Sequence, residues 1–77
     1  MKSYDRSFFT EVGKRIKQQR NAKKFTRDEF AVMLGVSSKF VYEIEVGGRG
    51  MSVLTLYRIS KALEISTDWL LNGDGKS

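Results

Sequence analysis

The chain has 77 residues, enough for one small domain, because a chain of this size buries only about 60% of the surface that its unfolded form exposes. It contains no cysteine and no histidine, which removes disulfides and the commonest metal ligands, so we expect no metal site and no cofactor. No apolar run reaches the roughly 18 residues that span a bilayer, and no N-terminal stretch resembles a signal peptide. We therefore expect a cytoplasmic protein without a membrane partner.

Positive charge is concentrated near the N-terminus. The formal net charge is +5, with eight basic and two acidic residues in positions 1–24 and six basic and seven acidic residues in the remaining 53. This asymmetry favours a polyanionic partner such as nucleic acid. A solvated basic helix face explains the charge alone equally well.

The first expected helix covers residues 7–23. Val12, Ile16 and Arg20 recur at spacings of three or four residues, which indicates one buried face of a helix. Phe8 and Phe9 add an apolar end to this helix, and its opposite face is basic. The pattern predicts a helix packed along one side.

Residues 26–47 have the features of two helices joined by a tight turn. Thr26 and Glu29 have the spacing of a capping box, and Gly35 ends the first helix before Ser37 caps the second. A connection this short, centred on glycine, holds the helices at a steep angle and predicts a helix-turn-helix. The expected buried stripe of the first of these helices consists of Phe30, Ala31 and Leu34.

The second helix of this unit is expected over residues 38–46. Helical spacing turns Val41 and Ile44 inward, with Phe40 near them. The side chains left on the outer face are Ser38, Lys39, Tyr42 and Glu43.

Two further helices follow a glycine-rich turn at residues 47–50. This turn lacks the spacing and the lysine of a phosphate-binding loop, so we interpret it as a helix end. Ser52 caps a fourth helix, and Ser66 caps a short fifth helix that ends at Asn72-Gly73. The fourth helix has an expected buried stripe of Val53, Leu56, Ile59 and Leu63, and the fifth buries Trp69 and Leu70. The prediction is an all-α single domain, residues 1–77, with five short helices.

The ordered motifs over residues 12–73 resemble the Cro/repressor-type helix-turn-helix proteins, also called the XRE family, which include the lambdoid phage repressors. The matching residues are Val12-Gly13, Ile16, Arg20, Thr26 to Ala31, Gly35-Val36-Ser37, Val41, Ile44, Glu45, Gly47, Leu56, Ile59, Leu63 and Asp68 to Gly73. The resemblance implies a compact five-helix lambda-repressor-like domain. Its second helix would cross the DNA backbone and its third would lie in the major groove.

The resemblance also implies which side chains touch base edges. They are Ser38, Lys39 and Glu43, with Tyr42 as an apolar contact to a thymine methyl group. Lysine can donate to guanine, glutamate can accept from cytosine, and serine suits either role. The alternative is that these side chains form a solvated helix face.

Phosphate contacts are expected from the start of the second helix, at Thr26 and Arg27, because helix N-termini and guanidinium groups both bind phosphate oxygens. Further candidates are Arg20, Lys14, Lys17 and Arg49. Two positions depart from the family pattern, since Arg27 replaces the usual glutamine and Val46 replaces a polar or basic residue. Arg20 and Glu45 match a partly buried structural ion pair of the phage repressors.

These features predict a sequence-specific regulator of transcription that binds double-stranded DNA, acting as a repressor. Proteins of this class commonly bind inverted-repeat operators as homodimers, on half-sites about 34 Å apart. Candidates for the dimer interface are Leu54, Tyr57 and Leu71. We expect a stand-alone regulator with no small-molecule ligand.

Two other functions compete with this interpretation of the sequence. One is an antitoxin or protein-interaction module of a toxin–antitoxin pair that also binds DNA. The other is an enzyme, in which acid–base chemistry would fall to Asp28, Glu29, Glu43 or Glu45. None of these carboxylates belongs to a recognisable pocket-forming loop, so we expect no enzymatic activity.

Overall fold

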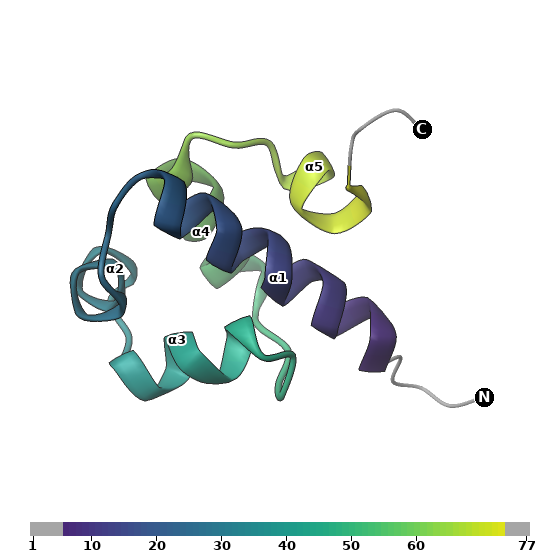
Figure 1. Ribbon diagram of the computed structural model, residues 1–77, viewed down its shortest axis with the longest axis horizontal. Coiled ribbons are helices and arrows are strands. Elements are labelled where there is room, and N and C mark those ends of the chain that lie inside the picture. The colour runs from purple at the N-terminus through teal and green to yellow at the C-terminus, as the bar shows by residue number, and fades with distance from the viewer. Residues whose placement is uncertain (1–5, 74–77) are drawn as a thin grey trace.

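The computed structural model describes residues 6–73, which fold into five α-helices around one core (Figure 1). These helices are α1 (Arg6–Ala22), α2 (Arg27–Leu34), α3 (Ser38–Glu45), α4 (Val53–Leu63) and α5 (Thr67–Asn72). The all-α, five-helix prediction is confirmed, with the bounds of α1 and α3 shifted by a single residue.

Local capping groups determine where four of the helices begin. Thr26, Ser37, Ser52 and Ser66 each accept a hydrogen bond from the backbone N–H three residues later. Such bonds satisfy a helix N–H that has no partner within its own helix. Thr26 also donates its backbone N–H to the Glu29 carboxylate at 2.9 Å, which completes the predicted capping box.

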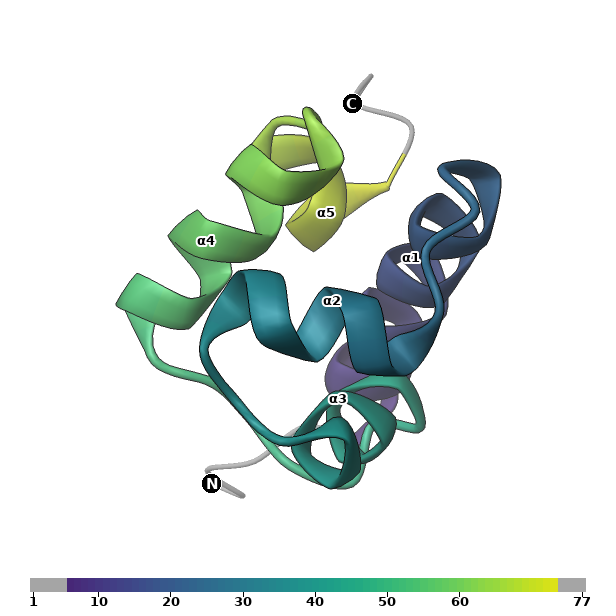
Figure 2. The same ribbon diagram turned by 90° about the vertical axis from the view of Figure 1, so that its left-hand side faces the viewer.

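The turn between α2 and α3 depends on Gly35. This residue has a φ of +73°, a left-handed conformation that glycine adopts with little steric cost. Its N–H bonds to the carbonyls of Ala31 and Val32 and so ends α2. In Figures 1 and 2 the axes of α2 and α3 cross steeply, as the short connection predicts.

The core draws apolar side chains from all five helices. Its fully buried members are Val12, Ile16, Phe30, Ala31, Leu34, Val41, Ile44, Ile59, Leu63 and Leu70. Figure 2 shows α2 lying above α3, with α4 to one side and α1 to the other. This packing buries the inner faces of α2 and α3 against the same core.

The predicted stripe of α4 is wrong at Val53. This side chain is 84% exposed because it lies directly after the Ser52 cap, at the end of α4 that projects from the core. Leu56 is half-buried, and only Ile59 and Leu63 are fully buried. The buried face of α4 therefore begins one turn later than predicted.

Two glycines allow α1 to pack closely against the end of α3. A Cβ atom on Gly13 would lie 2.4 Å from the carbonyl oxygen of Ile44, and one on Gly47 would lie 2.7 Å from the Cα atom of Thr10. Gly47 also has a φ of +77°, and its N–H donates to the Ile44 carbonyl at 3.0 Å. The glycine-rich turn is thus a helix end.

Arg15 connects α1 to α5. Its Nε atom donates to the Leu70 carbonyl at 2.8 Å and its Nη2 atom donates to the Leu71 carbonyl at 3.1 Å. Carbonyls in the last turn of a helix have no partner within it, so the guanidinium caps α5. In the sequence, Arg15 is distinguished only as one of the eight basic residues of positions 1–24.

Candidate nucleic-acid interface

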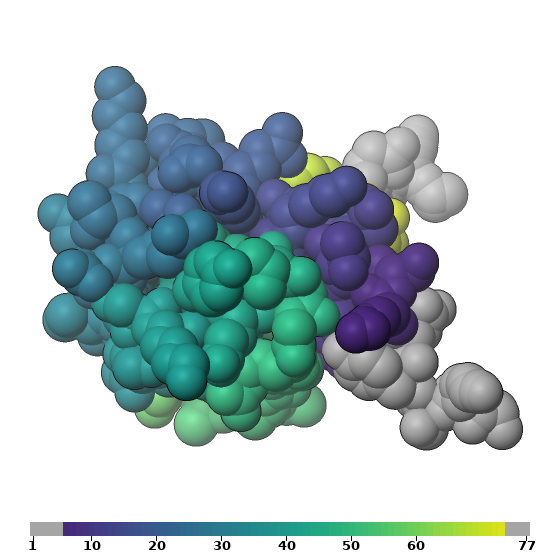
Figure 3. Space-filling model, turned by 60° about the horizontal axis from the view of Figure 1, so that its bottom comes forward, coloured from purple at the N-terminus to yellow at the C-terminus, as the bar shows by residue number. Residues whose placement is uncertain are grey.

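The outer face of α3 lies at the molecular surface. Val41 and Ile44 are buried, whereas the Lys39 side chain is 83% exposed and Tyr42 is half-exposed. In Figure 3 the segment containing α3 occupies the middle of one face, with residues of α2 on one side and of α1 on the other.

No helix within residues 6–73 is long and apolar enough to cross a bilayer.

The polar side chains of this face have partners within the protein. Glu43 accepts from Arg49 Nη1 at 3.2 Å, and its other oxygen lies 3.9 Å from the Lys39 ammonium. Ser38 donates its hydroxyl to the carboxylate of Asp28 on α2. The face therefore has defined side-chain positions and a balanced charge.

Arg49 belongs to the same face through two contacts. Besides its ion pair with Glu43, its guanidinium carbon lies 4.3 Å from the centre of the Phe40 ring. Cation–π contacts of this kind keep a guanidinium in place while leaving it partly exposed. Arg49 is thus positioned beside the middle of α3, between Phe40 and Glu43.

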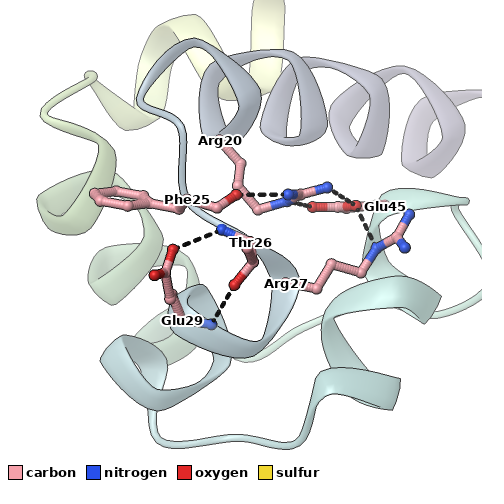
Figure 4. Close-up of polar contacts among 6 residues, drawn as sticks. All are labelled: Arg20, Phe25, Thr26, Arg27, Glu29 and Glu45. Carbon is pink, nitrogen blue, oxygen red and sulfur yellow. Dashed lines mark hydrogen bonds and ion pairs between the residues drawn. The ribbon is translucent and has the colours of Figure 1, made fainter.

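A buried ion pair joins α1 to the end of α3 (Figure 4). Arg20 Nε donates to Glu45 Oε2 at 2.6 Å and Arg20 Nη2 donates to Glu45 Oε1 at 3.1 Å. Arg20 Nη1 donates to the Phe25 carbonyl at 2.7 Å. Arg20 is only 6% exposed, so its expected second role at a phosphate is corrected: its guanidinium faces inward.

Arg27 has two partners that sequence reasoning missed. Its Nε atom donates to Glu45 Oε1 at 3.0 Å, so one buried carboxylate serves two arginines. Its guanidinium carbon also lies 5.2 Å from the centre of the Tyr42 ring. In Figure 4, Arg27 extends from the start of α2 to the end of α3. This position places a cation beside the outer face of α3.

The remaining expected phosphate ligands differ in whether their donor groups are exposed and whether they already have partners within the protein. The backbone N–H of Thr26 is occupied by Glu29, although its hydroxyl hydrogen is free of that bond because its oxygen acts as the acceptor. Lys14 is exposed and lies 3.6 Å from Glu11 in an ion pair. Lys17 is exposed. Lys14 and Lys17 therefore remain accessible cations on α1.

Helical spacing places Lys17 on the side of α1 that meets α3. Thr10 lies against Gly47 and Gly13 lies against Ile44, while Arg20 pairs with Glu45. Positions 10, 13, 17 and 20 form one row along a helix, because neighbours on a helix surface are three or four residues apart. Lys17 thus belongs to the row that borders the end of α3.

The three dimer candidates occupy different environments. Leu54 and Tyr57 are more than half exposed on α4, and the Lys61 ammonium lies 5.5 Å from the centre of the Tyr57 ring. Leu71 is half-buried and packs against the core, so it offers less surface than the other two. Tyr57 also borders a shallow groove of about 350 Å³ that Met33 lines from α2.

No group of acidic side chains in residues 6–73 is arranged to hold a metal ion.

The fold and this face define a compact five-helix domain with a helix-turn-helix whose second helix is presented outward. The family model described as helix-turn-helix matches residues 16–70, more than half of the chain. The chain belongs to this helix-turn-helix family, and the resemblance to Cro/repressor-type proteins is confirmed.

Two relatives come from Bacillus subtilis. The HTH-type transcriptional regulator YqaE is 36% identical over 59 residues, which are 77% of this chain and 51% of that protein. The SPbeta prophage-derived HTH-type transcriptional regulator YonR is 33% identical over 61 residues, which are 79% of this chain and 56% of that protein. The chain thus spans about half the length of these relatives.

Solved structures show the same fold. The P22 c2 repressor in complex with a synthetic operator has a TM-score of 0.79 and 33% identity, covering 82% of this chain and 96% of that chain. The biofilm regulator SinR in complex with DNA has a TM-score of 0.74 and 32% identity, covering 79% of this chain and 98% of that chain. The lambda-repressor-like architecture is therefore confirmed.

Proposed function

We propose that this chain is a DNA-binding regulator of transcription that acts as a repressor and reads the major groove of double-stranded DNA with α3. The observation that best supports this proposal is the outward face of α3. Lys39 is 83% exposed there, on a helix whose opposite face is buried. A B-DNA major groove is about 12 Å wide and admits one α-helix. The DNA complexes of the P22 c2 repressor and SinR support this proposal.

In this proposal α3 supplies base contacts and its surroundings supply phosphate contacts. Lys39 and Glu43 read base edges together with Ser38, and Tyr42 contacts a thymine methyl group. Lys14 and Lys17 on α1, with Arg27, Arg49 and the Thr26 hydroxyl, contact phosphate oxygens. These roles require neither a catalytic group nor a cofactor or small-molecule ligand, and they suit a cytoplasmic protein.

The proposed single domain comprises residues 1–77, and residues 12–73 are the part of it that resembles the family.

We further propose that the protein binds an inverted-repeat operator as a homodimer through Leu54 and Tyr57, with Leu71 at the margin. A symmetric dimer would present two copies of α3 to half-sites about 34 Å apart. Sedimentation of the protein with and without operator DNA tests this arrangement. Leu54→Glu should abolish two-to-one binding while a half-site duplex still binds, and an unchanged stoichiometry would exclude this interface.

The experiment that tests DNA reading begins with selection of bound sequences from a random duplex pool. A shared motif, present as an inverted repeat, is the expected result. Recovery of sequences without any common motif would contradict sequence-specific binding. A toxin or other protein that co-purifies and blocks selection would instead favour the protein-interaction alternative.

Two lysine variants separate base contacts from phosphate contacts. Lys39→Ala should lose about 1–3 kcal/mol of binding free energy on the selected operator and little on random DNA. Lys17→Ala should weaken binding to both DNAs and lower the slope of log affinity against log salt by about 1 for each half-site bound. Lys23→Ala is the control of equal charge change, because its ammonium pairs with Glu64 at the end of α4. Equal losses on both DNAs for Lys39→Ala would exclude base reading by that residue.

A further inference from the structure

Ser38, the first residue of α3, forms a hydrogen bond with α2. This bond determines whether the Ser38 hydroxyl can donate or accept toward another partner. The Ser38 hydroxyl donates to a carboxylate oxygen of Asp28. Ser38 is half-buried, whereas Asp28 is exposed in the first turn of α2. The bond spans the Gly35 turn and connects the two helices of the helix-turn-helix.

A serine hydroxyl has one hydrogen to donate and two lone pairs that accept. In Ser38 the hydrogen is directed to a carboxylate, so only the lone pairs remain for another partner. A hydrogen bond to an ionised acceptor is roughly twice as strong as one between neutral groups. Rotating the hydroxyl toward a base oxygen would exchange the stronger bond for a weaker one and would leave Asp28 without this donor.

In the major groove, adenine and cytosine present an exocyclic amine that donates, whereas guanine and thymine present an oxygen that accepts. We infer that Ser38 reads DNA as an acceptor only and selects adenine or cytosine, with Asp28 as the positioning residue that imposes this choice. The inference rests on the proposed function, since it requires α3 in the major groove. It replaces the permissive role expected for a serine.

The negative charge of Asp28 gives a second effect that can be measured, on the overall affinity for DNA. A carboxylate in the first turn of α2 stabilises that helix through the helix dipole, but it repels phosphates near the same helix end. Removing it should therefore raise affinity for all DNA while lowering discrimination at one base. A residue with only a structural role would not produce these two opposite changes.

The test uses the operator selected by the wild-type protein. Ser38→Ala first identifies the base position whose preference depends on Ser38. Affinities are then measured for duplexes with each of the four base pairs there, and with an analogue that lacks only the amine, purine for adenine or 2-pyrimidinone for cytosine. The wild-type protein should favour the amine-bearing base by about tenfold over guanine, thymine or the analogue.

Asp28→Ala should reduce this preference to within about threefold, mainly through a gain of affinity for the duplexes with guanine or thymine. Glu11→Ala is the matched control, because Glu11 pairs with Lys14 on α1, and its loss should leave the preference unchanged. Thermal melting of each variant checks folding. If Asp28→Ala does not fold, the loss of affinity for the amine-free analogue in wild-type protein but not in Ser38→Ala decides the acceptor role.

Three results would overturn the inference while leaving DNA reading intact. They are an unaltered preference in folded Asp28→Ala, a preference for guanine or thymine at the Ser38 position, and base preferences in Ser38→Ala that match the wild type everywhere. If the wild-type protein selects no motif from the random pool, the proposed function and the inference both fail. The two failures are thus distinguished by the first selection.

Discussion

Arg20 and Glu45 form a bidentate ion pair that connects α1 to the end of α3, with N···O distances of 2.6 and 3.1 Å. The Glu45 side chain is fully buried. Arg20→Met should lower the free energy of unfolding by about 3 kcal/mol, because a buried carboxylate would lose its main partner. Arg27, which also contacts Glu45, limits the loss. Urea denaturation followed by circular dichroism measures the change.

A double variant separates the pair's net contribution from the effect of an isolated charge. Replacing a buried ion pair by apolar side chains of similar volume is often close to neutral. Arg20→Met with Glu45→Met should therefore be more stable than Arg20→Met alone. If the double variant is equally or more unstable, a buried unpaired charge is not the cause of the loss.

Gly13 determines how closely α1 approaches α3. Alanine normally stabilises a helix by about 1 kcal/mol relative to glycine, but a Cβ at this position would lie 2.4 Å from a backbone carbonyl oxygen. Gly13→Ala should therefore destabilise the domain by about 1–3 kcal/mol, as overpacked cores do. Chemical denaturation measures it.

Gly48→Ala is the matched control for Gly13→Ala. A Cβ on Gly48 would meet its nearest atoms at 3.5 and 3.7 Å, which are ordinary contacts. The substitution should change the free energy of unfolding by less than about 0.5 kcal/mol. A Gly13→Ala variant as stable as Gly48→Ala would show that α1 can move away without loss.

Helix ends and the buried stripes, apart from Val53 in α4, could be predicted because both depend on neighbours in the sequence. Thr26 with Glu29 marked the start of α2, and Gly35 marked its end, through bonds that span only a few residues. The periodic Val12 and Ile16 likewise indicated the buried face of α1. Short-range capping and helical periodicity were thus sufficient for the five-helix fold.

Apart from the Arg20–Glu45 pair, which the family resemblance implied, the polar contacts between helices could not be predicted. Arg27 with Glu45 and Asp28 with Ser38 join residues that are brought together only when α2 and α3 pack. A long charged side chain shows no sequence pattern that distinguishes solvent from a partner on another helix. The candidate base-reading residues could be named, but the groups that orient them required the structure.

Arg15 is expected to hold α5 on the domain. This helix has six residues and is too short to be stable alone. Arg15→Met removes both hydrogen bonds to its terminal carbonyls and should lower the free energy of unfolding by about 1–2 kcal/mol. The fluorescence of Trp69, the single tryptophan of the chain, reports the environment of α5 directly.

Lys17→Met is the control for Arg15→Met, since it changes the same helix by the same charge at an exposed position. It should leave both the Trp69 emission and the stability nearly unchanged. If the two variants behave alike, loss of charge on α1 explains the effect and the α5 cap does not.

Lys24 occupies a conformation that favours glycine. Its φ is +63°, in the left-handed region, where a residue with a Cβ pays about 1–2 kcal/mol of steric strain. Part of the gain from Lys24→Gly is offset, because glycine adds conformational entropy to the unfolded chain. The variant should be more stable by about 0.5–1 kcal/mol, which corresponds to a rise in Tm of roughly 2–8 °C for a domain of this size.

Ala22→Gly tests whether the gain depends on backbone conformation. Ala22 is the last residue of α1, with a helical backbone, so glycine there should lower stability by up to about 1 kcal/mol. The two substitutions, two residues apart, should thus move Tm in opposite directions in scanning calorimetry. A fall in Tm for both variants would show that the left-handed strain at Lys24 is too small to outweigh the entropy of the added glycine.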